Sequence, residues 1–282
     1  MMSQGTTNQA LKPSKANRRT SKPYDIDVKL RHKVSSVLPL LTKEQTQKSF
    51  FTFVQTFWDV VVPNTGYFNW HMKYLCDQLQ IIAERVFNNE ERKYDLIVNV
   101  PPGSGKSTIC SIMFPAWIWA RMPSAKIICV SLTNDLAEKF SMKTRALVNS
   151  ELYQLSFPYV KLERKTKTRL GTTEGGERRS YGTNSNVTGE HAHFILLDDL
   201  INPVMALSDK ALAATNEWMD TTISSRQIVT DRVLTATLLM MQRLHQNDST
   251  GYWLNKPENA GTVKHICLPA DLHGKSEVKR RD

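Results

Sequence analysis

The sequence predicts an α/β fold with a mainly parallel sheet that is sandwiched between helices. Three observations support this prediction. Short apolar segments that favour β-structure recur along the chain, and segments with helical periodicity lie between them. Strands that are apolar on both sides are typical of a parallel sheet whose two faces are covered. The length of 282 residues and the hydrophobic content of 40% are sufficient for a large core.

The predicted elements alternate along the chain. Apolar residues recur at three- and four-residue spacing over residues 70–87, which predicts an amphipathic helix. The predicted strands comprise residues 95–100, 126–132, 193–197, 232–241 and 262–268. Further helices are predicted after the first strand up to about residue 121, over 134–150 and over 208–223. Thr133 or Asn134 can cap the second of these. The basic, glycine-rich region before the third strand has no predicted regular structure.

The positive charge of the chain is concentrated in two segments. The formal net charge is +10. Residues 1–33 hold eight basic and two acidic side chains, residues 161–182 hold seven and three, and the rest of the chain is balanced. Cationic segments bind nucleic-acid phosphates without reading sequence, because they release condensed counterions. Lys12–Lys33 and Lys161–Arg179 are therefore candidates for DNA contact, and a solvated basic loop is the alternative for either.

The sequence also excludes several classes of protein. The longest nearly uninterrupted apolar run, Ile109–Ala120, is too short to span a bilayer, and the polar, basic N-terminus is unlike a secretory signal. The cysteines are far apart and form no CxxC pattern: Cys76, Cys110, Cys129 and Cys267. We expect them to be buried free thiols in a reducing compartment, with no disulfide framework and no zinc site.

A glycine-rich segment after the first strand predicts a phosphate-binding loop. It reads Pro101-Pro102-Gly103-Ser104-Gly105-Lys106-Ser107-Thr108. Glycines let successive backbone N–H groups face an anion, and the helix N-terminus adds its positive dipole. We expect Lys106 to reach the β- and γ-phosphates of ATP and the Ser107 hydroxyl to bind Mg²⁺. The full Walker A pattern is not met, because Val100 stands where its first glycine is expected. A glycine-rich turn that caps a helix is the alternative interpretation.

Two carboxylates at the end of the third strand predict a Walker B motif. The apolar run Phe194–Leu197 leads into Asp198 and Asp199. We expect Asp198 to hold the metal, because open parallel sheets bind ligands at the carboxyl ends of their strands. Asp199 would orient or deprotonate the attacking water. The strand over 126–132 intervenes between the two motifs, which favours ATPases in which a second acidic residue activates water. A strand followed by an acidic turn is the alternative.

These residues resemble a known family, the ATPase domain of the large terminase subunit, the DNA-packaging motor of tailed bacteriophages. The similarity runs from about residue 50 to Ala270 and is carried by Asn69-Trp70-His71, NVPPGSGKST, FPAWIWA, SLTNDLAEKFS, TGEHAHFILLDD and MQRLHQNDSTG. The last segment is the most specific, since Walker motifs occur in many ATPases. The resemblance implies a P-loop NTPase of the RecA-like, ASCE type that uses ATP and Mg²⁺.

The resemblance assigns a role to each matching position. It implies Asp199, Lys106 and Arg243 as catalytic residues, although many relatives have the longer Glu at the position of Asp199. The implied metal ligands are Ser107 and Asp198. The implied nucleotide-binding residues are Pro102, Gly103, Ser104, Gly105, Lys106, Ser107, Thr108, Trp70, His71 and Gln242.

Two of these segments have further implied functions. Trp70 and His71 match the adenine-side segment, where an aromatic ring can stack on the base, and a core aromatic at a helix start is the alternative. Gln242, Arg243 and His245 match the coupling motif, which senses the γ-phosphate and transmits hydrolysis to DNA movement. A strand that leads into a polar turn is the alternative for this segment.

A transition-state cation is not assigned by the resemblance. Some relatives carry an arginine inside the phosphate loop, where Gly103 or Ser104 stands here. A cation is still needed to neutralise charge on the transferred phosphoryl group. The candidates, in cis or from a neighbouring subunit, are Arg145, Arg178, Arg179, Arg226 and Arg243.

The predicted organisation has four parts. They are a disordered basic arm (1–33), a helical lead-in with the adenine-side segment (34–94), the P-loop ATPase core (95–270) and a linker or tail (271–282). No segment matches the nuclease domain that large terminases usually carry, so we expect ATP hydrolysis without DNA cleavage. The resemblance implies double-stranded DNA bound through its backbone, a portal protein and a small terminase subunit as partners. It also implies a homo-oligomeric ring and action in the host bacterial cytoplasm, away from membranes.

Two other classes of function are alternatives. A helicase-like ATPase would need a second RecA-like lobe, and no residues remain in this sequence to build one. A non-catalytic scaffold with a degenerate nucleotide site would not need Lys106, Ser107, Asp198 and Asp199 together.

Overall fold

An eight-stranded sheet forms the centre of the computed structural model, which describes residues 40–63, 68–163, 166–187, 189 and 191–268. These residues belong to one compact unit. The predicted basic arm over 1–33 and the predicted tail over 271–282 lie outside the described residues.

The sheet is mainly parallel, as predicted. Its strand order is β3-β4-β5-β2-β6-β7-β1-β8, and only the pairs β3–β4 and β4–β5, toward one edge, are antiparallel. The strands are β1 (Asp95–Asn99), β2 (Lys126–Ser131), β3 (Leu162–Glu163), β4 (Arg169–Thr172), β5 (Glu177–Gly182), β6 (Phe194–Asp198), β7 (Ala236–Met241) and β8 (Val263–Cys267). All residues of β1, β6 and β7 are buried, which explains why their sequences are apolar without alternation.

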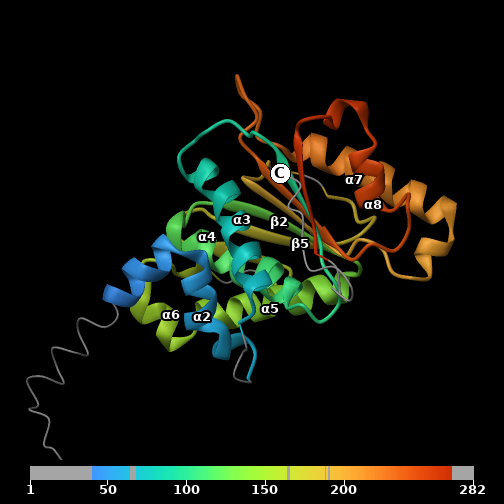
Figure 1. The fold of residues 1–282 in the computed structure, drawn as a ribbon. Helices are drawn as coiled ribbons and strands as arrows, with labels where there is room; N and C mark the ends of the chain where they lie inside the picture. Colours follow the sequence, from blue (N-terminus) through green and yellow to red (C-terminus); the bar gives the residue numbers. More distant parts are fainter. Residues whose placement is uncertain (1–39, 64–67, 164–165, 188, 190, 269–282) are drawn as a thin grey trace, which may run out of the picture. The chain divides into compact units, whose positions relative to one another are not determined.

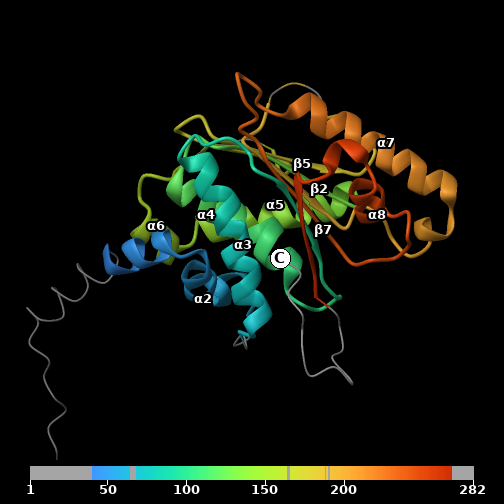
Figure 2. The same cartoon turned by 45° about the horizontal axis from the view of Figure 1, so that its top comes forward.

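Helices cover both faces of this sheet (Figure 1, Figure 2). One face carries α2 (Phe50–Val61), α3 (Trp70–Phe87), α4 (Phe114–Arg121), α5 (Asn134–Val148) and α6 (Glu151–Ser156). The other face carries α7 (Asp209–Arg226) and α8 (Ser249–Leu254). The described part of the chain also contains a helical segment over 40–48, a π-helix (Thr108–Met113) directly before α4, and two short 3₁₀ turns (Met205–Leu207 and Pro257–Asn259).

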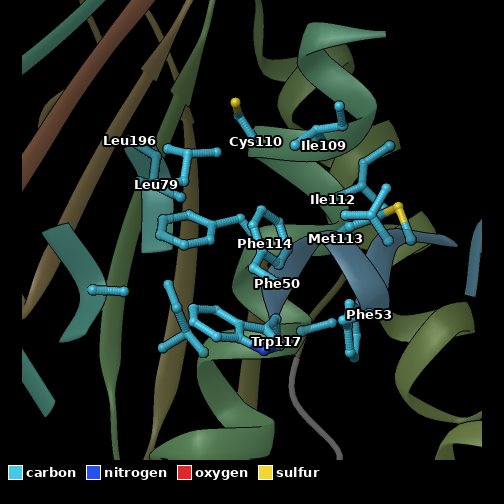
Figure 3. Close-up of a cluster of buried hydrophobic side chains, with 14 of the residues drawn as sticks. Phe50, Phe53, Leu79, Ile109, Cys110, Ile112, Met113, Phe114, Trp117 and Leu196 are labelled. Atoms are coloured by element: carbon cyan, nitrogen blue, oxygen red, sulfur yellow. The ribbon is translucent and has the colours of Figure 1, made fainter. Parts of the chain in front are cut away.

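The larger apolar cluster joins the N-terminal helices to the helix after the phosphate loop (Figure 3). The ring of Phe50 in α2 lies 5.2 Å from that of Phe114 and 5.0 Å from that of Trp117, both in α4. The indole N–H of Trp117 donates to the carbonyl of Thr46 at 2.8 Å. The segment before β1 therefore shares one core with the element that follows the phosphate loop.

Most predicted elements are present with small changes at their ends. The helix over 70–87 is α3, and Thr133 is the cap of α5, because its hydroxyl accepts from the Leu136 amide at 3.2 Å. The helix predicted over 208–223 is α7, which continues to Arg226. The strand predicted from residue 232 begins only at Ala236, since Val233 instead forms an isolated bridge with Val229.

The basic region before β6 is structured, contrary to the prediction. Residues 161–182 include β3, β4 and β5, and β5 pairs in parallel with β2. The region was missed because its central run is charged. Glu177 accepts hydrogen bonds from Arg169 and Arg179, and Arg178 is fully buried, so much of the local charge is compensated or enclosed.

The cysteine prediction is confirmed for three of four residues. Cys76, Cys110 and Cys129 are buried free thiols, whereas Cys267 at the end of β8 is exposed, because β8 is an edge strand. Among the described residues, no helix combines the length and the apolar character needed to cross a membrane.

Candidate active site

The candidate site lies at the carboxyl ends of β1, β7 and β6, which are neighbours in the sheet. The phosphate loop follows β1, the two carboxylates end β6, and the predicted coupling segment follows β7. In the sheet, β7 lies between β1 and β6. The segment 126–132, which lies between the two motifs in the sequence, forms β2 and pairs with the other side of β6. Three segments that are distant in sequence thus meet at one edge, as expected for a parallel sheet.

The backbone of the phosphate loop has the geometry that its glycines permit. Gly103 and Gly105 have φ angles of 76° and 78°, a region that residues with a Cβ atom rarely adopt. The helical conformation begins at Lys106. Within the described residues, the amides of Gly103, Ser104 and Gly105 donate to no other group, and the buried Ser104 hydroxyl has no partner. These unpaired donors fit an anionic ligand at the helix N-terminus.

Lys106 and Asp199 form an ion pair across the site. The Lys106 Nζ atom lies 2.9 Å from Asp199 Oδ2, and the lysine side chain is almost entirely buried. A buried ammonium group needs a partner, and the Asp199 carboxylate is that partner. The predicted phosphate-binding cation and the predicted water-activating carboxylate are therefore in direct contact.

Asp198 is buried beside the start of the helix. Its two carboxylate oxygens accept hydrogen bonds from the Ser107 hydroxyl at 3.2 Å and from the Ser111 hydroxyl at 2.6 Å. Burial raises the pKa of the Asp198 carboxyl to about 6, the charge of Asp199 acts in the same direction, and the two serine hydrogen bonds oppose the change.

Ser107 and Asp198 form a donor set that fits Mg²⁺. This ion binds through one or two carboxylates and hydroxyls, with water and nucleotide phosphates as its remaining ligands. In the described part of the chain no group of three or more His, Cys, Asp or Glu side chains could hold a metal by itself. Any magnesium site here would thus be completed by the nucleotide.

Asp199 adopts an unusual backbone conformation. Its φ angle is 48°, a left-handed value that Asp tolerates better than most residues. The Asp199 amide donates to the Met240 carbonyl at 2.8 Å, and Asp199 Oδ1 accepts from the Gln242 amide at 3.1 Å. The end of β7 therefore fixes the orientation of this carboxylate, as strained residues at functional sites often require.

The predicted coupling segment is held by a buried aspartate. Asp248, the N-cap of α8, accepts from Arg243 Nε at 3.0 Å and from the amides of Leu244, His245 and Gly251. If Gly251 carried a Cβ atom, that atom would lie 1.8 Å from the carbonyl oxygen of Gln246. The loop that contains Gln246 therefore packs directly on the first turn of α8.

The predicted adenine-side residues lie beside the phosphate loop. A ring nitrogen of His71 (Nε2) is 3.2 Å from the carbonyl oxygen of Ser104, so α3 contacts the loop directly. Trp70 precedes it at the start of α3 and is 60% exposed. Of the two alternatives for Trp70, a core position is wrong, because the ring is exposed.

The five candidate arginines occupy different parts of the fold. Arg243 lies at the candidate site edge. Arg145 is in the last turn of α5, and Arg226 in the last turn of α7 donates to the Gly189 carbonyl. Arg179 pairs with Glu177, and the buried Arg178 donates to the main chain of Ser111. Among these five, Arg243 is the one that follows a strand at the carboxyl edge, where the phosphate loop lies.

Two site residues, Ser111 and Asn99, were missed by sequence reasoning, and Asp248 stands in the segment MQRLHQNDSTG but was given no role. Ser111 holds Asp198, and Asp248 holds Arg243. Asn99 donates to the Met241 carbonyl at 3.1 Å and to the Thr250 hydroxyl at 3.0 Å. Ser111 lies one helical turn after Ser107, and that spacing is a signal that could have found it. Asn99 is a polar residue at the end of an apolar strand, a second usable signal.

Comparison with known proteins identifies one family. The model of the family described as Terminase large subunit, T4likevirus-type, N-terminal, matches residues 97–264. No curated protein matches the chain.

Solved structures show a related fold. The HK97 bacteriophage large terminase is similar with a TM-score of 0.51 and 14% identity, over 81% of this chain and 45% of that chain. A mutant of the Thermus phage P74-26 large terminase ATPase domain gives a TM-score of 0.41 and 15% identity, over 66% and 80% of the two chains. The similarity to the HK97 protein confirms the predicted RecA-like fold class. The chain spans less than half the length of that protein.

Proposed function

The chain belongs to the family of T4-like-virus-type large terminase subunits, N-terminal part, and we propose that it is the ATP-hydrolysing motor domain that drives double-stranded DNA into the viral procapsid. The single observation that carries this proposal is the meeting of Lys106, Ser107, Asp198 and Asp199 at one sheet edge. A turn without a catalytic function would not need a buried lysine paired with one carboxylate and a second buried carboxylate beside it.

Each residue of this cluster has a proposed role in ATP hydrolysis. The phosphate loop, from Pro102 to Thr108, binds the phosphate oxygens through the free amides of Gly103, Ser104 and Gly105. Ser107 and Asp198 hold Mg²⁺, which when bound offsets negative charge on the β- and γ-phosphates. Asp199 orients the attacking water and accepts its proton.

The Lys106–Asp199 ion pair brings the proposed phosphate-binding cation and the proposed water-activating carboxylate together. The γ-phosphate of bound ATP would be a second anionic partner for Lys106. We expect Lys106 to contact the phosphates and Asp199 to face the attacking water.

The segment after β7 is proposed to couple hydrolysis to movement. The Gln242 amide donates to Asp199 Oδ1, so a change at the carboxylate is transmitted to the start of this segment. Arg243, at the same edge, is proposed to offset transition-state charge once it leaves Asp248, and His245 lies in the same turn. His71 and Trp70 are proposed to lie on the adenine side, since α3 contacts the phosphate loop through His71.

The proposed partners follow from the family. They are double-stranded DNA contacted through its backbone, a portal protein and a small terminase subunit, with the chain acting in a homo-oligomeric ring in the host bacterial cytoplasm. Mg²⁺-dependent hydrolysis without endonuclease activity completes the proposal, since the matching family model describes an N-terminal part of large terminases.

The test is Mg²⁺-dependent ATP hydrolysis with and without double-stranded DNA. We expect DNA of any sequence to stimulate the rate, and the stimulation to fall steeply as salt rises, because the contact is with phosphates. A duplex-unwinding assay distinguishes a helicase, and incubation of plasmid DNA with the protein and Mg²⁺ tests for cleavage. Failure to bind ATP with Mg²⁺, or strand separation in place of translocation, would contradict the proposal.

A further inference from the structure

Arg178 in β5 is a charged residue that is completely buried. Its relative exposure is 0%, and its guanidinium donates to the Ser180 hydroxyl at 2.8 Å and to the main-chain carbonyl of Ser111 at 3.0 Å. It also lies beside the Cys129 thiol, whose pKa is raised by burial and lowered by this neighbouring cation. In the part of the chain that the structure describes, no carboxylate pairs with Arg178 directly.

An enclosed guanidinium without a direct counter-ion costs stability. Desolvation of a charge is expensive, and neutral hydrogen-bond acceptors repay only part of it. A hydrophobic residue of similar length would fill the same space between β5 and the helices without this penalty. The cost indicates that the donors of Arg178 are needed where they point, and one of them points at the carbonyl of Ser111 in the helix after the phosphate loop.

The carbonyl of Ser111 lacks the amide donor that it would have in a regular α-helix. Its partner in a regular α-helix would be the amide of residue 115, four positions later, but that residue is proline and has no N–H. The backbone here forms a π-helix over Thr108–Met113, in which the Phe114 amide donates to the carbonyl of Ile109, five residues earlier. Thr144 of α5 donates to the adjacent Ile112 carbonyl at 3.1 Å, so side chains from two other elements support this turn.

The other end of Ser111 contacts the candidate active site. Its hydroxyl donates to Asp198 Oδ2 at 2.6 Å, which leaves Oδ1 beside Ser107. One residue therefore connects a buried cation on one side to a buried carboxylate on the other. Since π-turns occur frequently at functional sites, this irregularity is an expected place for such a link.

We propose that Arg178 is a positioning residue, which holds the π-turn so that Ser111 orients Asp198 to bind the metal. This inference rests on the proposed function and extends it by one residue that does not touch the nucleotide. Arg178 acts through Ser111, and outer partners of metal ligands typically change metal affinity when they are removed.

The test measures how nucleotide binding depends on Mg²⁺. A fluorescent ATP analogue is titrated in EDTA and at increasing Mg²⁺ concentrations against the wild type, Arg178→Met, Arg178→Lys and Ser111→Ala, together with thermal unfolding. Arg121→Met is the matched control, because Arg121 makes an ion pair with Glu84 at the far end of α4 and its loss affects stability alone.

The expected result is a change in metal dependence without a change in metal-free binding. Arg178→Met and Ser111→Ala should each raise the Mg²⁺ concentration for half-maximal binding by about tenfold, while affinity in EDTA stays within about twofold. Arg178→Lys should lie between the wild type and Arg178→Met, because an ammonium can still donate to the Ser111 carbonyl. A double variant that combines Arg178→Met with Ser111→Ala should bind no more weakly than the weaker of the two single variants, since both residues act on one path.

Two results separate the inference from the function on which it rests. If the wild type shows Mg²⁺-dependent binding but Ser111→Ala keeps the wild-type midpoint, the inference fails even if Arg178→Met does not fold, and the proposed function stands. If Arg178→Met merely loses stability as Arg121→Met does, the inference also fails. If the wild type itself binds ATP no better with Mg²⁺, the proposed function fails.

Discussion

Lys106 shows how a single residue connects sequence pattern, packing and proposed chemistry. Its position after Gly105 identifies it from sequence, and its 7% exposure shows that its charge is used inside the protein. The glycine before it has a positive φ and lies against Trp58 and Met72, so the loop is supported by the N-terminal helices. The lysine is therefore held in place before any nucleotide binds.

Replacement of Lys106 tests this role directly. Lys106→Ala should weaken ATP binding by about tenfold or more, which corresponds to about 1.4 kcal/mol, because the phosphates lose their buried cation. Calorimetric titration with Mg²⁺ and ATP measures the change. Lys73→Ala on the surface of α3, where Lys73 pairs with Asp77, is the control and should bind as the wild type does. Equal affinities in both variants would contradict the assignment of the phosphate loop.

Asp198 should make the ligand-free protein less stable as the pH rises. Its folded-state pKa of about 6 is above the ordinary value of 3.8, chiefly because the carboxyl is buried. The folded state therefore binds this proton more tightly than the unfolded state. The stabilisation of the folded state by the protonated Asp198 carboxyl is complete below pH 3.8 and is lost as the pH rises through about 6. Asp198→Asn, which cannot ionise, should raise the melting temperature relative to the wild type at pH 8 but not at pH 4.

Thermal unfolding of both proteins across this range is the measurement. Asp209→Asn, at the exposed start of α7, is the control and should show no such crossover. A wild type and an Asp198→Asn variant whose melting temperatures differ equally at both pH values would show that burial does not penalise the Asp198 charge.

The catalytic residues were easier to predict than the residues that hold them. Lys106, Asp198 and Asp199 stand in short motifs next to apolar strands, so their chemistry can be read locally. Ser111 and Asp248 contact the site through a π-turn and a helix cap, and these depend on tertiary packing. Serine is common in unrelated positions, so the sequence alone did not indicate Ser111, and although Asp248 stands in the segment MQRLHQNDSTG, its role as a buried cap did not show there.

At the scale of elements, the clearest difference between prediction and structure is β5. Its sequence, Glu177–Gly182, contains three consecutive charged residues and no aliphatic one, so no apolar run indicates a buried strand. The strand forms because its charges are compensated: Glu177 pairs with Arg169 and Arg179, and Arg178 donates to Ser180 and to the distant carbonyl of Ser111. The parallel strands β1, β6 and β7, in contrast, are mainly apolar and were predicted within a few residues.

The cap of α8 should be more important for stability than an ordinary helix cap. Asp248 is fully buried and accepts from three backbone amides and from Arg243. Asp248→Ala should lower the free energy of unfolding by about 2–4 kcal/mol, because several buried donors lose their acceptor together. Denaturant unfolding measures the loss.

Ser208→Ala is the matched control for this prediction. Ser208 caps α7 with a single hydrogen bond, to the Ala211 amide, and that bond is exposed. Its loss should cost only about 1 kcal/mol. If both variants lose the same free energy, the network around Asp248 contributes no more than a single cap.

At the scale of the whole molecule, the described residues combine one sheet with two apolar clusters, one on each face. The N-terminal helices α2 and α3 belong to the same apolar cluster as the helix after the phosphate loop. The segment before β1 therefore supports the candidate site through this shared core. The order of the parallel strands was beyond sequence reasoning, because β1, β2, β6 and β7 are all apolar enough to occupy the centre. Only the structure shows that β7 separates β1 from β6, which brings the segment after β7 against Asp199.

The central claim is that the phosphate loop and the carboxylates after β6 form one hydrolytic site. Asp199→Asn tests it most directly, because Asn tolerates the left-handed backbone at this position and keeps the side-chain shape, while it cannot accept a proton. We expect Mg²⁺-dependent ATP hydrolysis to fall by about 100-fold or more, with ATP binding retained. An Asp199→Asn variant that binds ATP and hydrolyses it at the wild-type rate would contradict the claim.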